Sequence, residues 1–67
     1  MKVFVFCRDY NKDKLVNLGM KEVSFVPPPQ STVVLRGKSY FVEDTIFLLD
    51  YDRCELIVHE QEKAIGL

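Results

Sequence analysis

The 67-residue sequence contains few of the residues on which metal sites and many catalytic sites depend: one histidine, two cysteines and no tryptophan. A structural zinc site normally takes four cysteine or histidine ligands at short spacings, which these residues do not provide. Two cysteines allow only one disulfide, far from the density of a small secreted disulfide scaffold. We therefore expect Cys7 and Cys54 to be reduced thiols, and we expect neither a metal nor a cofactor.

The sequence also lacks an excess of either charge and any long hydrophobic run. Lys and Arg number 9 and Asp and Glu number 10, which gives a net charge of −1, whereas nucleic-acid-binding proteins usually carry a basic excess. No apolar run approaches the ~20 residues of a membrane span, and the apolar stretch 3–6 is too short for a secretory signal. We expect a cytoplasmic protein, with residues 1–67 forming one small folded domain.

The residues after Pro27–Pro29 are typical of β-strands separated by tight turns. Gly37 lies between two β-rich runs, where a hairpin turn needs positive φ. Glu43 and Asp44 interrupt the second run and predict a bulge or bend in a long strand. In the last run, alternation places Cys54 and His59 on opposite faces. The predicted strands are 32–35, 39–49 and 54–59, with a turn at 50–53 before the last.

The N-terminal part allows two interpretations. Residues 2–7 predict a strand that is apolar on both faces, and residues 23–26 predict another. Between them, one interpretation is a short helix capped by Asn11. The other is a hairpin turn at 10–13 with a return strand from Leu15, which we favour because so short a helix is marginal alone. Residues 60–67 predict a frayed tail or a short docking strand.

The stretch from Val26 to Val42 resembles the Pro-x-x-Gly-Asp-x-Val and Gly-Lys-x-Tyr-x-Val pattern of small SH3-like β-barrel proteins, which are common among accessory proteins of phages and prophages. Residues 37–42 match the second part, whereas Gln30 and Ser31 stand where the first part has Gly-Asp. The resemblance implies a phage-type protein and no catalytic residue. We predict an all-β fold, either a small five-stranded SH3-like barrel or a strongly bent antiparallel sheet.

Function is predicted to be non-catalytic binding, because no nucleophile, base and orienting group are grouped in the sequence. The resemblance implies a protein that binds and inhibits or modulates a host protein, including a defence nuclease. Tyr51 between Asp50 and Asp52 combines an aromatic anchor with negative charge, which suits a basic partner. These three residues are the first candidate binding site.

Two other functions stay open from the sequence. Tyr10, Arg36, Lys38 and Tyr40 place aromatic rings beside basic turns, the minimum for a single-stranded nucleic-acid-binding module, although the net charge argues against it. A structural protein or homodimer is the other, because the run 45–49 is apolar on both faces and Ile46 and Phe47 belong either to the core or to an interface. We expect the turns at 12–14 and 36–38 to share one end of the fold, with the Asp50 turn at the other.

Overall fold

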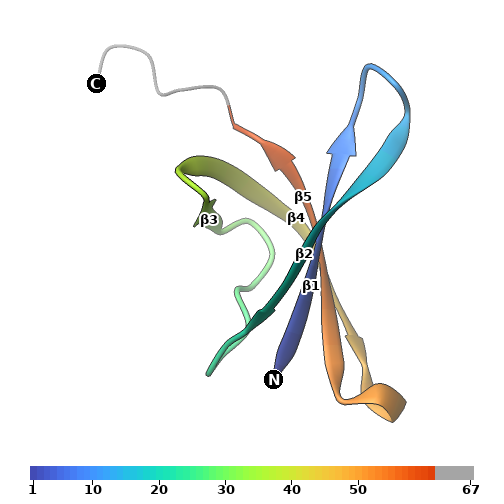
Figure 1. Cartoon of the computed structure of the whole chain (residues 1–67), viewed down its shortest axis with the longest axis vertical. Helices are drawn as coiled ribbons and strands as arrows, with labels where there is room; N and C mark the ends of the chain where they lie inside the picture. The colour runs from blue at the N-terminus through green and yellow to red at the C-terminus, as the bar shows by residue number, and fades with distance from the viewer. Residues whose placement is uncertain (62–67) are drawn as a thin grey trace.

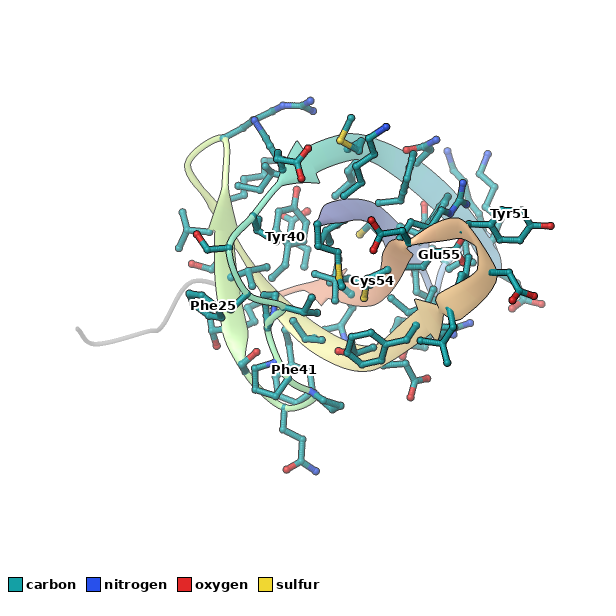
Figure 2. The ribbon with its side chains drawn as sticks, turned by 90° about the horizontal axis from the view of Figure 1, so that it is seen from below. Phe25, Tyr40, Phe41, Tyr51, Cys54 and Glu55 are labelled. Carbon is teal, nitrogen blue, oxygen red and sulfur yellow. The ribbon has the colours of Figure 1, made fainter. Side chains whose placement is uncertain are left out.

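The computed structural model describes residues 1–61 and shows an all-β fold, as predicted, in which one sheet curls into a half-barrel (Figures 1 and 2). Its strands follow the alternation of apolar residues and end at turn residues. The elements are β1 (Lys2–Asp9), β2 (Lys14–Glu22), β3 (Thr32–Leu35), β4 (Lys38–Leu48), the short 3-10 helix η1 (Leu49–Tyr51) and β5 (Arg53–Glu60).

The strand order is β2-β1-β5-β4-β3, and one neighbouring pair is parallel. β1 and β5 run in the same direction, with Val3 opposite Cys54 and Cys7 opposite Val58. The other pairs are antiparallel. The predicted bent five-stranded sheet is therefore confirmed, except that this central pair is parallel and not antiparallel. Parallel neighbours need a crossover, which the chain from β2 to β4 supplies here.

The β1–β2 connection is a hairpin, which confirms the favoured interpretation and excludes the helix. Oδ1 of Asp9 accepts hydrogen bonds from the backbone N–H groups of Asn11 and Lys12, at 3.0 and 3.3 Å. An aspartate that bonds to the backbone two residues on stabilises a turn locally. The β1–β2 register shifts between Val5 and Phe6, which increases the local twist of the hairpin.

The β3–β4 hairpin and the bulge in β4 also follow the sequence. Arg36 and Gly37 have φ values of 53° and 80°, the left-handed pair that a two-residue hairpin turn requires. The register of β4 against β5 shifts between Val42 and Asp44. Glu43 is therefore the extra residue of a bulge, at the charged pair where the sequence predicted one.

The strand expected at residues 23–26 is absent. Val23 still exchanges backbone hydrogen bonds with Met1, both at 3.0 Å, and the chain then leaves the sheet. Pro27–Pro29 offer no backbone N–H, so this segment cannot continue a ladder. Instead the carbonyl of Pro27 accepts a hydrogen bond from the Thr45 hydroxyl at 2.9 Å, which fastens the connection across the inner face of β4.

The core lies on the inner face of the curl, around Tyr40 and Cys54 (Figure 2). Its buried members are Val3, Val5, Tyr40, Val42, Cys54, Leu56 and Val58. Ile46 and Phe47 are 41% and 53% exposed, so the expectation that they belong to the core is wrong. They lie near the end of β4, beyond the part of the sheet that curls most closely; the alternative expectation, an interface, stays a prediction.

The outer face of β1 is covered by a long charged side chain. The guanidinium of Arg53 lies 4.2 Å from the ring centroid of Phe4, and its NH2 group is 2.5 Å from a carboxylate oxygen of Glu55. Arginine can cover apolar surface with its stem while its charge stays paired. This explains how a strand that is apolar on both faces is accommodated in a sheet with one core.

At the C-terminal side, the first two residues of the predicted frayed tail or docking strand continue the sheet. Glu60 belongs to β5, and the N–H of Gln61 still bonds to the carbonyl of Ser39 at 3.0 Å. The rest of that prediction, residues 62–67, lies outside the described residues. Within residues 1–61 no helix has the length and apolar character to cross a membrane.

Candidate functional site

The topology places the turns at two opposite ends of the sheet (Figure 1). The β1–β2 turn at 10–13 and the β3–β4 turn at 36–37 share one end, here called the tip end, because β1 and β5 run toward it and β4 runs away from it. The η1 turn lies at the other end. The expected division of the turns between the two ends is confirmed.

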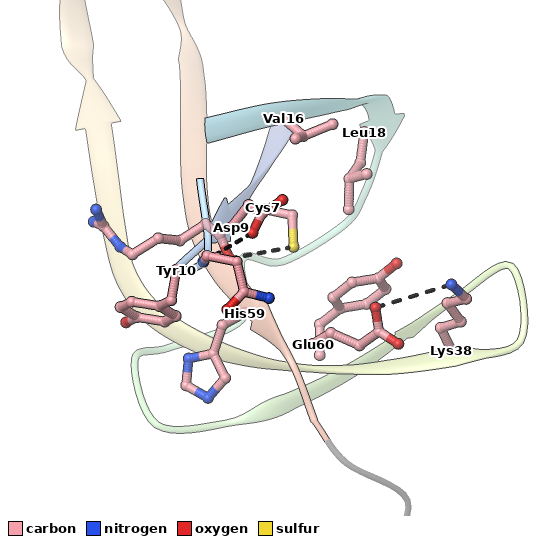
Figure 3. A pocket seen from close by; sticks show the side chains of 11 residues that line it. Cys7, Asp9, Tyr10, Val16, Leu18, Lys38, His59 and Glu60 are labelled. Atoms are coloured by element: carbon pink, nitrogen blue, oxygen red, sulfur yellow. Dashed lines mark hydrogen bonds and ion pairs between the residues drawn. The ribbon is translucent and has the colours of Figure 1, made fainter. Parts of the chain in front are cut away.

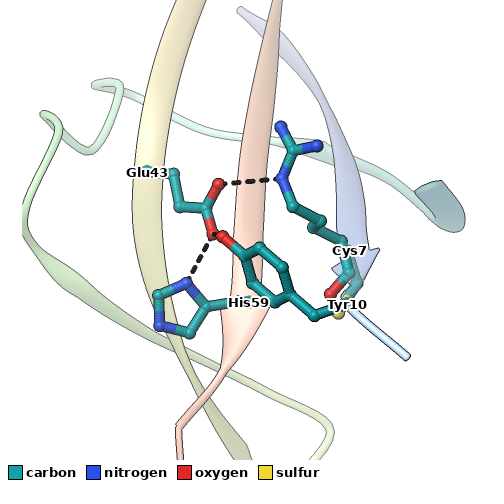
Figure 4. A network of polar contacts seen from close by, with 5 residues as sticks. Cys7, Tyr10, Glu43 and His59 are labelled. Atoms are coloured by element: carbon teal, nitrogen blue, oxygen red, sulfur yellow. Dashed lines mark hydrogen bonds and ion pairs between the residues drawn. The ribbon is translucent and has the colours of Figure 1, made fainter. Parts of the chain in front are cut away.

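Four side chains form a polar cluster on the outer face near the tip end, centred on Glu43 (Figure 4). Arg8 Nε donates to Oε1 of Glu43 at 3.1 Å, and His59 Nδ1 lies 2.6 Å from Oε2. The Tyr10 hydroxyl also donates to Oε2. These four residues are the Glu43 cluster, and they connect β1, the first turn, β4 and β5.

The backbone explains why these residues meet. Arg8 and His59 lie on the outer face of adjacent parallel strands, and the bulge in β4 brings the Glu43 carboxylate toward both. The His59 ring also packs against Phe41, opposite it in the ladder, with centroids 5.2 Å apart. Tyr10 approaches the same imidazole edge-on, at 6.0 Å.

The cluster changes the electrostatics of its members. Burial alone raises the pKa of Glu43, but the hydrogen bonds from Tyr10, His59 and Arg8 together outweigh it and hold this pKa below its ordinary value. The same bonds to the carboxylate raise the pKa of Tyr10 and of Arg8. Glu43 is therefore an anion at neutral pH that fixes the position of three neighbouring groups.

Beside the cluster, the mouth of the half-barrel forms a hollow of about 650 Å³ (Figure 3). The residues that line it from the inner face are Cys7, Val16, Leu18 and Tyr40. Lys38 and Glu60, 3.9 Å apart in a solvent-exposed pair, lie at its rim. Tyr10 and His59 line the hollow as well as belonging to the Glu43 cluster, so the cluster forms part of its wall.

The arrangement does not assemble a cysteine–histidine pair. Burial raises the pKa of both Cys7 and Cys54, which favours the unreactive thiol. Cys54 faces the core and His59 the outer surface, as the alternation predicted. Among residues 1–61, the only hydrogen-bond partner of the His59 ring is Glu43. The two cysteines are four ladder positions apart along the parallel pair, roughly 13 Å at strand spacing.

At the opposite end, the segment 47–52, here called the acidic turn, exposes three large apolar side chains in five residues. Phe47, Leu49 and Tyr51 are 53%, 87% and 75% exposed, and Tyr51 points away from the curled sheet (Figure 2). Asp50 and Asp52 alternate with them, and neither carboxylate forms an ion pair with any residue the structure describes. All three residues of the predicted trio, Asp50, Tyr51 and Asp52, are therefore exposed.

The residues predicted for nucleic-acid binding do not form one surface. Tyr40 is only 7% exposed and belongs to the core, so its ring offers no face on which a base can stack. Tyr10 is 66% exposed on the outer side, where its hydroxyl is held by Glu43. The Arg36 side chain instead extends toward β2. A terminal nitrogen of its guanidinium lies 3.6 Å from the position that a β-carbon on Gly19 would occupy.

Sequence reasoning missed the Glu43 cluster. The sequence shows Glu43 as an interruption in an apolar strand and gives no indication that Arg8 reaches it. The cluster partners Arg8, Tyr10 and His59 are 35, 33 and 16 residues from Glu43 in the sequence. The one available signal was a charged residue inside an apolar strand, which identifies a bulge but not the side chains it meets.

Comparison with known proteins adds no assignment: no family model, no curated protein and no solved structure matches this chain.

Proposed function

We propose that this chain is a non-catalytic binding protein that attaches to a host protein through its acidic turn and inhibits or modulates it. The observation that carries the proposal is the exposure of Phe47, Leu49 and Tyr51 beside two free carboxylates. Large side chains exposed together at one end of a small sheet are unfavourable in water unless a partner covers them. Aromatic residues in such a setting are the usual anchors of protein interfaces.

The charge of the acidic turn supports a basic partner surface. Asp50 and Asp52 flank the exposed Tyr51 ring, and Arg53, which follows Asp52 in the sequence, is already paired with Glu55 at 2.5 Å. A local excess of negative charge around an apolar centre favours association with a positive surface and speeds it at low salt.

A nucleic-acid-handling enzyme of the host fits this chemistry as the target class. Its substrate groove is lined by Lys and Arg that bind phosphates, and a rigid turn with two carboxylates and an aromatic ring presents comparable groups. The resemblance to phage accessory proteins in residues 26–42 agrees with a role against a host defence nuclease. The proposed action is occupation of the groove, which requires no chemistry from this chain.

The test begins with affinity capture from bacterial lysate, followed by purification of the captured protein and calorimetry with the full chain. The binding variant is the double substitution Asp50→Lys and Asp52→Lys. Its matched control is Lys12→Glu with Lys14→Glu, two charge reversals at the tip end. We expect the first to weaken binding by about tenfold or more, and the control to change it little.

Two further results decide the proposal. Tyr51→Ala is expected to weaken binding while leaving the thermal midpoint unchanged, because the ring is 75% exposed. Binding that weakens as salt rises from about 0.05 to 0.3 M supports the electrostatic part. If both Asp50→Lys/Asp52→Lys and Tyr51→Ala keep full affinity, the contact lies elsewhere and the proposal is wrong.

A further inference from the structure

The two edges of the sheet differ in how they are protected. β2 forms one edge, and it carries Lys14, Lys21 and a bulge in its pairing with β1. Charges and bulges are the devices that prevent an edge from pairing with another strand. β3 forms the other edge, and its four residues, Thr32–Leu35, contain no charge, no proline and no bulge. Within residues 1–61, β3 therefore has none of these devices and is protected only by its short length.

The hydrogen-bonding pattern shows which backbone groups of β3 are free. A two-residue turn makes Leu35 and Lys38 a hydrogen-bonded pair, so the N–H and C=O groups of Val33 and Leu35 face β4. Those of Thr32 and Val34 consequently face away from the sheet. Both residues are exposed, and no residue of the described chain supplies another hydrogen bond to these outward groups.

Next to this edge lies an apolar groove of about 150 Å³. It is bounded on one side by Val33, Val34 and Leu35 of β3, and its floor includes Val3 and Val5 of the core. Val23 and Pro27 close it from the connection that precedes β3. The groove thus offers apolar contact to side chains of an extended segment whose backbone pairs with Thr32 and Val34.

The one charged residue among the described residues that line the groove is a cation. Lys21 lines the groove from β2, and Arg36 follows β3 directly and reaches toward Gly19 of β2. Neither Lys21 nor Arg36 forms an ion pair with any of residues 1–61. Two unpaired cations beside an apolar groove complement a segment that carries acidic residues next to its apolar ones.

We propose that the β3 edge and its groove bind an extended segment of a partner protein, with small branched apolar side chains directed into the groove and an acidic residue near Lys21 and Arg36. The segment adds a strand to the sheet beside β3, through the free backbone groups of Thr32 and Val34. This site is separate from the acidic turn and does not rest on the function proposed above.

The size and position of the edge favour a single extended segment over a second copy of this chain as the occupant. A stable dimer buries about 800 Å² on each partner, and a four-residue edge offers only a small part of that area. In a folded partner, a second strand lies about 4.8 Å behind the strand that pairs with β3. That second strand would point toward β2, on the far side of the groove. A single extended segment needs no such space.

The probe for this site is a capped seven-residue peptide in which valine alternates with threonine between two terminal glutamates. We expect it to slow hydrogen exchange at the Thr32 and Val34 amides of the full chain by about tenfold at saturation, and to shift the NMR signals of Lys21 and Val33. The same peptide with alternate backbone nitrogens methylated is expected to produce neither effect, because it cannot form the ladder.

Substitutions in the protein separate edge pairing from other binding. Val34→Pro removes an outward N–H that β4 does not use, so the fold is expected to persist while peptide binding is lost. Val34→Thr is the matched control and is expected to bind. Arg36→Glu is expected to weaken the glutamate peptide more than the same peptide with terminal lysines.

Three results overturn the proposal. The first is unchanged hydrogen exchange at Thr32 and Val34 when peptide is added, and the second is peptide binding that survives Val34→Pro. The third is exchange at these amides that becomes slower as the protein concentration rises in the absence of peptide, which indicates self-pairing. The function proposed for the acidic turn is tested independently, because Asp50→Lys with Asp52→Lys leaves the β3 edge unaltered. Peptide binding by that double variant is expected to equal that of the original chain.

Discussion

His59 Nδ1 lies 2.6 Å from a carboxylate oxygen of Glu43, which joins β5 to the bulge of β4 on the outer face of the sheet. The same carboxylate also holds Arg8 and Tyr10, so one residue connects both hairpins near the tip end. Since the Glu43 side chain is only 17% exposed, the loss of its charge weakens several hydrogen bonds that water does not readily replace.

Glu43→Gln is expected to lower the free energy of unfolding by about 1–2 kcal/mol, because charge-assisted hydrogen bonds become weaker or are lost. Asp44→Asn, a neighbouring neutralisation in the same strand, is the control and is expected to change stability little. Urea titrations of both variants at pH 7 provide the measurement. Equal midpoints for Glu43→Gln and the original chain would show that the cluster does not stabilise the fold.

The pKa of Glu43 also predicts an acid dependence of stability. Since it is lower in the folded chain than its ordinary value of 4.5, the contribution is fully present well above pH 4.5 and is lost as the pH falls from there through the folded-state pKa. Thermal midpoints measured between pH 7 and pH 2.5 are expected to fall less steeply for Glu43→Gln than for the original chain. Parallel curves would contradict the role of this carboxylate.

Core and turn positions are expected to respond differently to truncation. Leu56 is 2% exposed, so Leu56→Ala should cost about 2–5 kcal/mol and leave so small a domain mostly unfolded. Phe47 is 53% exposed, and Phe47→Ala should cost well under that amount. Circular dichroism melts distinguish the two. A large loss of stability for Phe47→Ala would show that the ring is covered in solution, as at an interface between copies.

The two thiols are expected to react at different rates. Cys54 is 0% exposed and Cys7 is partly exposed at the hollow, while burial raises the pKa of both. With N-ethylmaleimide at pH 7.5, mass spectrometry should find modification of Cys7 first and of Cys54 only as the chain unfolds. Modification of Cys54 at the rate of a short unfolded peptide would contradict its burial.

The β3–β4 turn is expected to depend on Gly37, whose φ is 80°. Gly37→Val forces a β-branched side chain into the left-handed region and should cost about 1–2 kcal/mol, although no atom lies within 4 Å of the added β-carbon. Gly37→Asn is the control, because asparagine adopts this conformation readily. If both variants melt at the same temperature, backbone strain at this turn is unimportant.

The local features of the fold were predictable because neighbouring residues specify them. The first hairpin, the turn at Gly37 and the bulge at Glu43 each follow from turn residues or from the alternation of apolar residues within a strand. The same alternation separated Cys54 from His59. The exposed trio around Tyr51 was predictable as well, since aspartates flanking an aromatic residue are typical of a solvent-facing turn.

Only the tertiary structure decided which strands are neighbours and which distant side chains meet. The parallel pairing of β1 with β5 depends on how the whole sheet curls, and no periodicity within either strand distinguishes a parallel from an antiparallel neighbour. That pairing places Arg8 beside His59, and the bulge of β4 brings Glu43 to both. The sequence by itself determined the strands, turns and bulge, because short-range sterics and alternation control them; the cluster, the core boundary and the free β3 edge follow from contacts between residues far apart in the chain.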